Sequence, residues 1–120
     1  MVRYVFAIGF ASLVGFGLSP ALQTPCGPTP TDEQLARRKT AINTARRINT
    51  AEAEAQAFPA AHKYMPLLLL KTVTVPDGFD VQVSTDGETY VFSIKDTTDQ
   101  CQVAVFSDQK GVIYTGTPLR

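Results

Sequence analysis

The strongest constraint on the fold is a change of hydrophobic period between residues 59 and 71. Before this point, apolar side chains recur at helical spacing on one face of a helix that Pro59 must end. Thr31 offers an N-cap to the helix, and Asp32 and Glu33 suit its positive end. The predicted core-facing stripe consists of Leu35, Ile42, Ala45, Ile48, Ala51, Ala55 and Phe58.

From Lys71 onward, apolar residues alternate with polar ones, and turn-forming residues interrupt the pattern at intervals of about ten residues. Connections this short allow only antiparallel pairing of neighbouring strands, so the strands should form a meander. The predicted fold is α+β, with one long amino-terminal amphipathic helix packed on a three- to four-stranded antiparallel sheet. The expected strands are 79–84, 89–95, 101–107 and 112–116.

Length and charge limit the functions that the chain can have. At 120 residues it has room for one hydrophobic core. Its 11 basic and 11 acidic residues leave no net charge, which argues against a general nucleic-acid binder. We therefore expect protein partners and no nucleic acid.

The first part of the chain is typical of an export signal or a membrane anchor, because residues 4–22 carry no charge and follow Arg3. Small residues at Ser19 and Ala21 favour cleavage after Ala21, although an uncleaved segment is about long enough to cross a bilayer. The protein is then periplasmic or secreted, or anchored to the inner membrane. The predicted organisation is a signal peptide or anchor at 1–21, a proline-rich spacer at 22–30 and a folded domain at 31–120.

Cys26 and Cys101 are the two cysteines of the chain. In an oxidising compartment they allow one pairing, and closing a loop of about 75 residues would stabilise the fold by about 4 kcal/mol. Alternatively, Cys101 is a small buried residue and Cys26 is a free thiol that links to another subunit. With His62 as its single histidine, the chain is short of ligands for a closed zinc site, and we expect no cofactor.

Five basic residues occupy the first half of the predicted helix outside its apolar stripe, and Glu52 and Glu54 follow on that polar face. This basic face could contact acidic residues of a neighbouring subunit or anionic lipid heads near the anchor, or it could be an ordinary solvated face. No aromatic residue lies among the basic ones, unlike in single-strand nucleic-acid sites. The candidate interaction residues are Arg37, Arg38, Lys39, Arg46 and Arg47.

Carboxylate pairs at Asp77 and Asp80, and at Asp96 and Asp99, are the strongest hint of catalysis. Each pair lies at a predicted turn, however, where aspartate is expected for backbone reasons. A single histidine without distinctive neighbours supports no Ser-His-Asp set. We expect no enzymatic activity.

A long helix carrying ARRINTAEAEAQ, a proline-ended connector and a meander with VPDGFDVQV, YVFSIKD and GVIYTG follow one another in the chain. This order resembles the globular domain of bacterial type IV pilin-like proteins over residues 36–118. The most specific parts are residues 48–53 and the hairpin at 108–114. The resemblance implies a non-enzymatic extracytoplasmic protein of the pilus or type II secretion kind, whose subunits pack helix to helix.

Two features depart from the pilin pattern. Gly15 and Phe16 lack the following glutamate of a prepilin cleavage motif, and the proline-rich spacer separates the apolar segment from the helix. We therefore expect an exported non-enzymatic structural or interaction protein, with a pilin-like domain detached from its assembly helix. A small soluble periplasmic or secreted binding or inhibitory module is the alternative.

Overall fold

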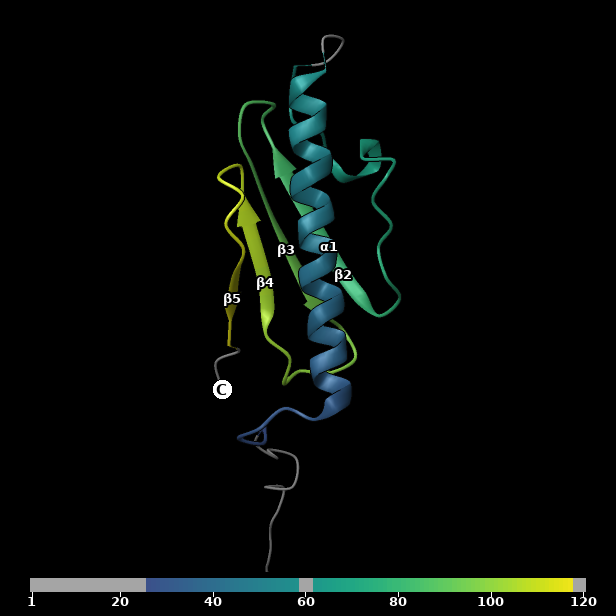
Figure 1. The fold of residues 1–120 in the computed structure, drawn as a ribbon, viewed down its shortest axis with the longest axis vertical. Helices are drawn as coiled ribbons and strands as arrows, with labels where there is room; N and C mark the ends of the chain where they lie inside the picture. The colour runs from purple at the N-terminus through teal and green to yellow at the C-terminus, as the bar shows by residue number, and fades with distance from the viewer. Residues whose placement is uncertain (1–25, 59–61, 118–120) are drawn as a thin grey trace, which may run out of the picture.

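The computed structural model describes residues 26–58 and 62–117. Within these residues, one helix, α1 (Asp32–Ala57), packs on a four-stranded antiparallel sheet of order β2-β3-β4-β5 (Figure 1). The strands are β2 (Phe79–Thr85), β3 (Tyr90–Asp96), β4 (Ala104–Asp108) and β5 (Tyr114–Gly116). This α+β meander confirms the predicted class and strand order. The predicted signal peptide or anchor at 1–21 lies outside the described residues.

The helix begins and ends close to the predicted residues. The Thr31 hydroxyl accepts a hydrogen bond from the Gln34 N–H at 3.1 Å, and the Gln34 side chain accepts one from the Thr31 N–H at 2.9 Å. This reciprocal capping box satisfies two of the N–H groups that a helix start leaves free. At the other end, Phe58 adopts an extended conformation just before Pro59, which disfavours a helical residue in front of it.

The core lies between α1 and the two central strands, β3 and β4. In β3 every second side chain faces the helix, as its alternating burial shows. Ile48, Ile94 and Val105 have no exposed surface. The buried apolar residues are Ala41, Ala45, Ile48, Ala51, Leu70, Tyr90, Phe92, Ile94 and Val105.

The prediction that the apolar stripe is buried along the whole helix is wrong at both ends. Leu35 is 48% exposed and Phe58 is 60% exposed. A helix of 26 residues is about 39 Å long, whereas a strand of 7 residues is about 23 Å long. The helix therefore extends past the strands at both ends, as Figure 1 shows, and its terminal apolar residues have no sheet to cover them.

Glu52, expected on the polar face of the helix, is instead fully buried. Its Oε1 accepts a hydrogen bond from the backbone N–H of Met65 at 2.7 Å, while Oε2 has no partner among the described residues. Burial raises the pKa of this carboxyl, and the hydrogen bond from Met65 offsets only part of the rise. Glu52 thus fixes the start of the connector between α1 and β2 to the helix.

We expect the stability of the protein to fall as the pH rises through the pKa of folded Glu52. Because folding raises this pKa, the folded state binds the proton more tightly, and its advantage is complete only below the pKa of the unfolded chain. Glu52→Gln keeps an acceptor for Met65 but cannot ionise, so the stability of this variant should not show the decline. Urea unfolding of both proteins between about pH 4 and 8 checks this. Equal pH profiles would contradict it.

Candidate interaction surfaces

A disulfide joins Cys26 to Cys101, with 5.4 Å between their Cα atoms. It links the proline-rich spacer to the turn between β3 and β4 and confirms the predicted intramolecular pairing. Cys101 was expected to open a strand, but β4 begins only at Ala104. The Asp99 carboxylate accepts a hydrogen bond from the Cys101 N–H at 2.8 Å, and this contact holds Cys101 in a turn. A disulfide is consistent with an oxidising, extracytoplasmic location.

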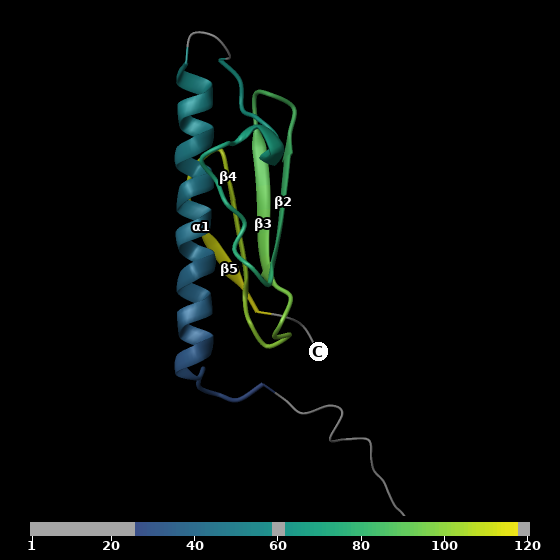
Figure 2. The same ribbon diagram turned by 90° about the vertical axis from the view of Figure 1, so that its right-hand side faces the viewer.

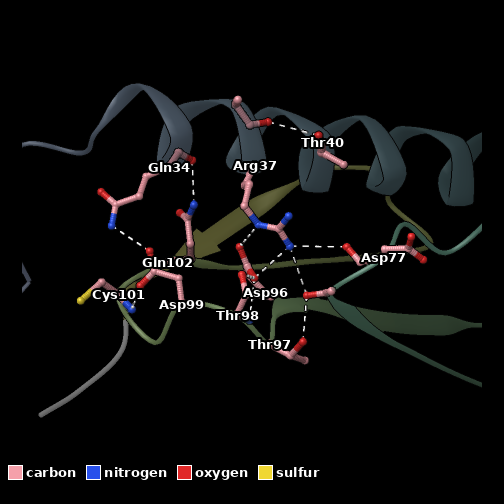
Figure 3. Close-up of polar contacts among 12 residues, drawn as sticks. Gln34, Arg37, Thr40, Asp77, Asp96, Thr97, Thr98, Asp99, Cys101 and Gln102 are labelled. Atoms are coloured by element: carbon pink, nitrogen blue, oxygen red, sulfur yellow. Dashed lines mark hydrogen bonds and ion pairs between the residues drawn. The ribbon is translucent and has the colours of Figure 1, made fainter.

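Arg37 was predicted on the exposed basic face, but it forms an ion pair with Asp96 beneath the first turns of α1 (Figure 3). Its Nε donates to Asp96 Oδ2 at 2.5 Å and its Nη2 donates to Oδ1 at 3.1 Å. The guanidinium also lies 4.5 Å from the ring centre of Phe79. Only 2% of the Asp96 side chain is exposed. Arg37 therefore fastens the helix to the sheet, while 27% of its side chain remains exposed.

The backbone of the predicted turn at residues 76–78 completes this ion-pair site. The Gly78 carbonyl accepts hydrogen bonds from Arg37 Nη2 at 3.3 Å and from the Thr97 N–H at 2.8 Å. Gly78 has a φ of 81°, and a Cβ at this position would lie 2.7 Å from Arg37 Nη2. Only glycine combines this conformation with so close an approach.

A second pair of contacts lies beside the ion pair. Gln34 donates to Asp99 Oδ2 at 2.8 Å, and Gln102 donates to the Gln34 carbonyl at 2.7 Å (Figure 3). Asp96 and Asp99, noted in the sequence as a carboxylate pair, thus both bind side chains of α1. Burial alone would raise the pKa of Asp96, but hydrogen bonds from Arg37 and Thr98 outweigh it and leave the pKa below its usual range.

We expect Asp96→Asn to lower the free energy of unfolding by about 2 kcal/mol at pH 7, because the replacement leaves Arg37 without its charged partner. Since folding lowers the pKa of Asp96, the stability that the carboxylate contributes is present at neutral pH and lost as the pH falls through the folded pKa. The gap between the two proteins should therefore shrink towards pH 3. Denaturant unfolding at both pH values measures it, and an unchanged gap would show that the charge is not the cause.

The remaining basic residues differ in burial and surroundings. Lys39 is exposed, whereas Arg38 is half-buried and its Nε is covered without a hydrogen-bond partner among the described residues. Arg46 and Arg47 are both exposed and line a hollow of about 380 Å³ between α1 and Thr72. A second hollow, of about 270 Å³, lies between α1 and Thr74 and also includes Arg47. The structure thus brings Arg46 and Arg47 together in one groove.

This groove follows the connector between α1 and β2. Seen from the β2 side, the connector crosses the space between the helix and the sheet (Figure 2). Val73 packs against the core, while Thr72 and Thr74 on either side of it are exposed. The alternating threonines and valines of residues 72–75 indicate a segment with one buried and one exposed face, but periodicity alone could not place this segment beside the helix.

A separate apolar surface lies on the face of the sheet opposite α1. Phe106 of β4 pairs with Tyr114 of β5, and their rings stack with centres 6.1 Å apart. Val91 of β3 is 56% exposed, and Phe106 and Tyr114 are 41% and 49% exposed. Exposed aromatic residues of this kind favour protein contacts.

Searches against protein-family models, curated proteins and solved structures each found no match. In residues 26–58 and 62–117, no helix is long and apolar enough to span a membrane. The same residues contain no group of three or more histidine, cysteine, aspartate or glutamate side chains that could hold a metal ion.

Proposed function

We propose that this protein is an exported, non-enzymatic structural or interaction protein that resembles the globular head of type IV pilins or pseudopilins. The observation that carries the proposal is the disulfide between Cys26 and Cys101, because a bond of this kind is typical of proteins that fold outside the cytoplasm. The uncharged run at residues 4–22 supplies the matching export signal or anchor.

The architecture supports the pilin part of the proposal. One helix laid over an antiparallel meander is the arrangement that the resemblance implies. The disulfide fixes the spacer next to the start of α1, so the folded head sits directly after the export segment in the chain. In this proposal the head acts through its surfaces, and its buried polar residues serve to hold helix and sheet together.

The exposed groove beside Arg47 favours a second candidate, a small soluble periplasmic or secreted binding or inhibitory module. The two candidates differ in what happens to residues 1–21. An interaction head of a membrane-associated assembly keeps its anchor or follows the pilin maturation pathway, whereas a soluble module loses the whole segment.

The mature amino terminus, determined by mass spectrometry in a bacterium that has a periplasm, tests the proposal. A terminus at Leu22 supports the soluble module. A terminus at Phe10 or Phe16, after a glycine, supports maturation as a pilin, and an intact chain in the membrane fraction supports an anchored head. An intact chain in the cytoplasmic fraction with both cysteines reduced would contradict both candidates.

A further inference from the structure

We propose that the groove between α1 and residues 71–76 binds an extended acidic peptide segment of a partner protein. The inference deepens the proposed function and rests on it, because it assumes that the protein acts by binding other proteins. Three observations carry it: the largely unpaired backbone of residues 71–75, the shape of the groove and the charge of its walls.

The backbone of residues 71–75 has few hydrogen bonds of its own, since among its N–H groups that of Val73 donates to the Leu70 carbonyl, at 3.1 Å, and closes a turn at 71–72. The N–H groups of Thr72, Thr74 and Val75 make no hydrogen bond within the described residues, and neither do the carbonyl groups of residues 71–75. Four of these five residues are β-branched, which suits them to strand pairing. A peptide that adds to such a segment gains main-chain hydrogen bonds without requiring a particular sequence.

The groove has the dimensions of a short extended peptide. Its two hollows share Arg47 and together follow α1 from Thr40 to Glu54. This part of the helix is about 21 Å long, which matches about six residues of extended chain. The second hollow is lined by Asn43 of α1 and by Thr74, both exposed, so it offers an amide and a hydroxyl group to a peptide.

The charge of the groove selects acidic side chains. Neither Arg46 nor Arg47 forms an ion pair among the described residues, and the Arg46 side chain donates only to Asn43 on its own helix, at 3.1 Å. Glu54 borders one of the two hollows, whereas the other contains Arg47 and no acidic residue. A carboxylate near Arg47, away from Glu54, would therefore be attracted.

The test uses the protein purified with its disulfide intact and three labelled seven-residue peptides. These alternate valine with glutamate, with glutamine or with lysine. We expect the glutamate peptide to bind more tightly than the glutamine one and the lysine peptide not to bind, with affinity falling as salt is raised. Amide hydrogen exchange should slow at Thr74, which lines the groove, when the glutamate peptide is added, because its N–H group becomes hydrogen-bonded.

Matched charge reversals separate the groove from the rest of the surface. Arg47→Glu should lower the affinity for the glutamate peptide by about tenfold or more. The same variant should gain measurable affinity for the lysine peptide. Lys110→Glu changes the net charge equally in the exposed turn between β4 and β5 and should leave both affinities unchanged. Equal effects of the two substitutions would overturn the proposal, since they would show attraction to net charge alone.

Other occupants of the groove give distinct results. Self-association that Arg47→Glu abolishes, without peptide binding, would assign the groove to a second copy and overturn the proposal. Arg47-dependent binding to anionic vesicles without peptide binding would assign it to a membrane and do the same. If the protein is exported and disulfide-bonded but binds none of the three peptides, the result contradicts this inference alone. If the protein is cytoplasmic and reduced, the result contradicts the proposed function.

Discussion

The double replacement Cys26→Ser, Cys101→Ser is expected to lower the free energy of unfolding by about 4 kcal/mol, because the bond closes a loop of 75 residues in the unfolded chain. The folded state should lose little else, since α1 keeps its capping box and its ion pair to Asp96. The fold should therefore survive with the same secondary structure and a lower melting temperature. Urea unfolding followed by circular dichroism measures the change.

A reductant provides the control for this prediction. Adding it to the wild-type protein should reproduce the loss of stability, and adding it to the double variant should change nothing. A loss below about 1 kcal/mol would contradict the prediction, because it would mean that the bond scarcely restricts the unfolded chain.

Ile48→Ala should cost about 3 kcal/mol of unfolding free energy. Ile48 has no exposed surface and belongs to the core cluster between α1 and the sheet, with Ile94 and Val105 also fully buried. Removing three of its side-chain carbons leaves a space that rigid neighbours fill only in part. Chemical unfolding of the purified variant gives the value.

Leu35→Ala is the matched control, because it makes a similar aliphatic truncation in the same helix. Leu35 is 48% exposed, so this change should cost less than about 1 kcal/mol. Arg47→Ala, at an exposed position next to Ile48, should cost less than about 0.5 kcal/mol. Equal losses for Ile48→Ala and Leu35→Ala would show that the helix packs on the sheet in another register.

The fold could be predicted from the sequence because its signals are local. Pro59 ends the helix, Thr31 begins it, and the alternation in residues 90–96 marks a strand with one buried face. Where the prediction failed, the cause is the packing of the helix on the sheet, which local signals do not determine. Leu35 has the right spacing for the core, but it lies beyond the end of the strands, and spacing alone does not say which part of the helix the sheet covers.

The surfaces were harder to predict than the fold. Arg37 and Arg47 look alike in the sequence, yet Arg37 is bound by Asp96, 59 residues further along the chain, whereas Arg47 lines an open groove. Glu52 was assigned to the exposed face because its charge suggests solvent, but the connector folds back over it and Met65 donates to it. Both outcomes depend on contacts between distant residues.

The thiol state of the protein in the exported fraction tests the central claim most directly. Cells that make the full chain are fractionated, and the protein is alkylated under denaturing conditions without reductant before its mass is measured. We predict that the exported protein carries no alkyl group, has a monomer mass and takes up two alkyl groups only after reduction, as the Cys26 to Cys101 bond requires. An exported monomer alkylated at both cysteines before reduction would contradict the account.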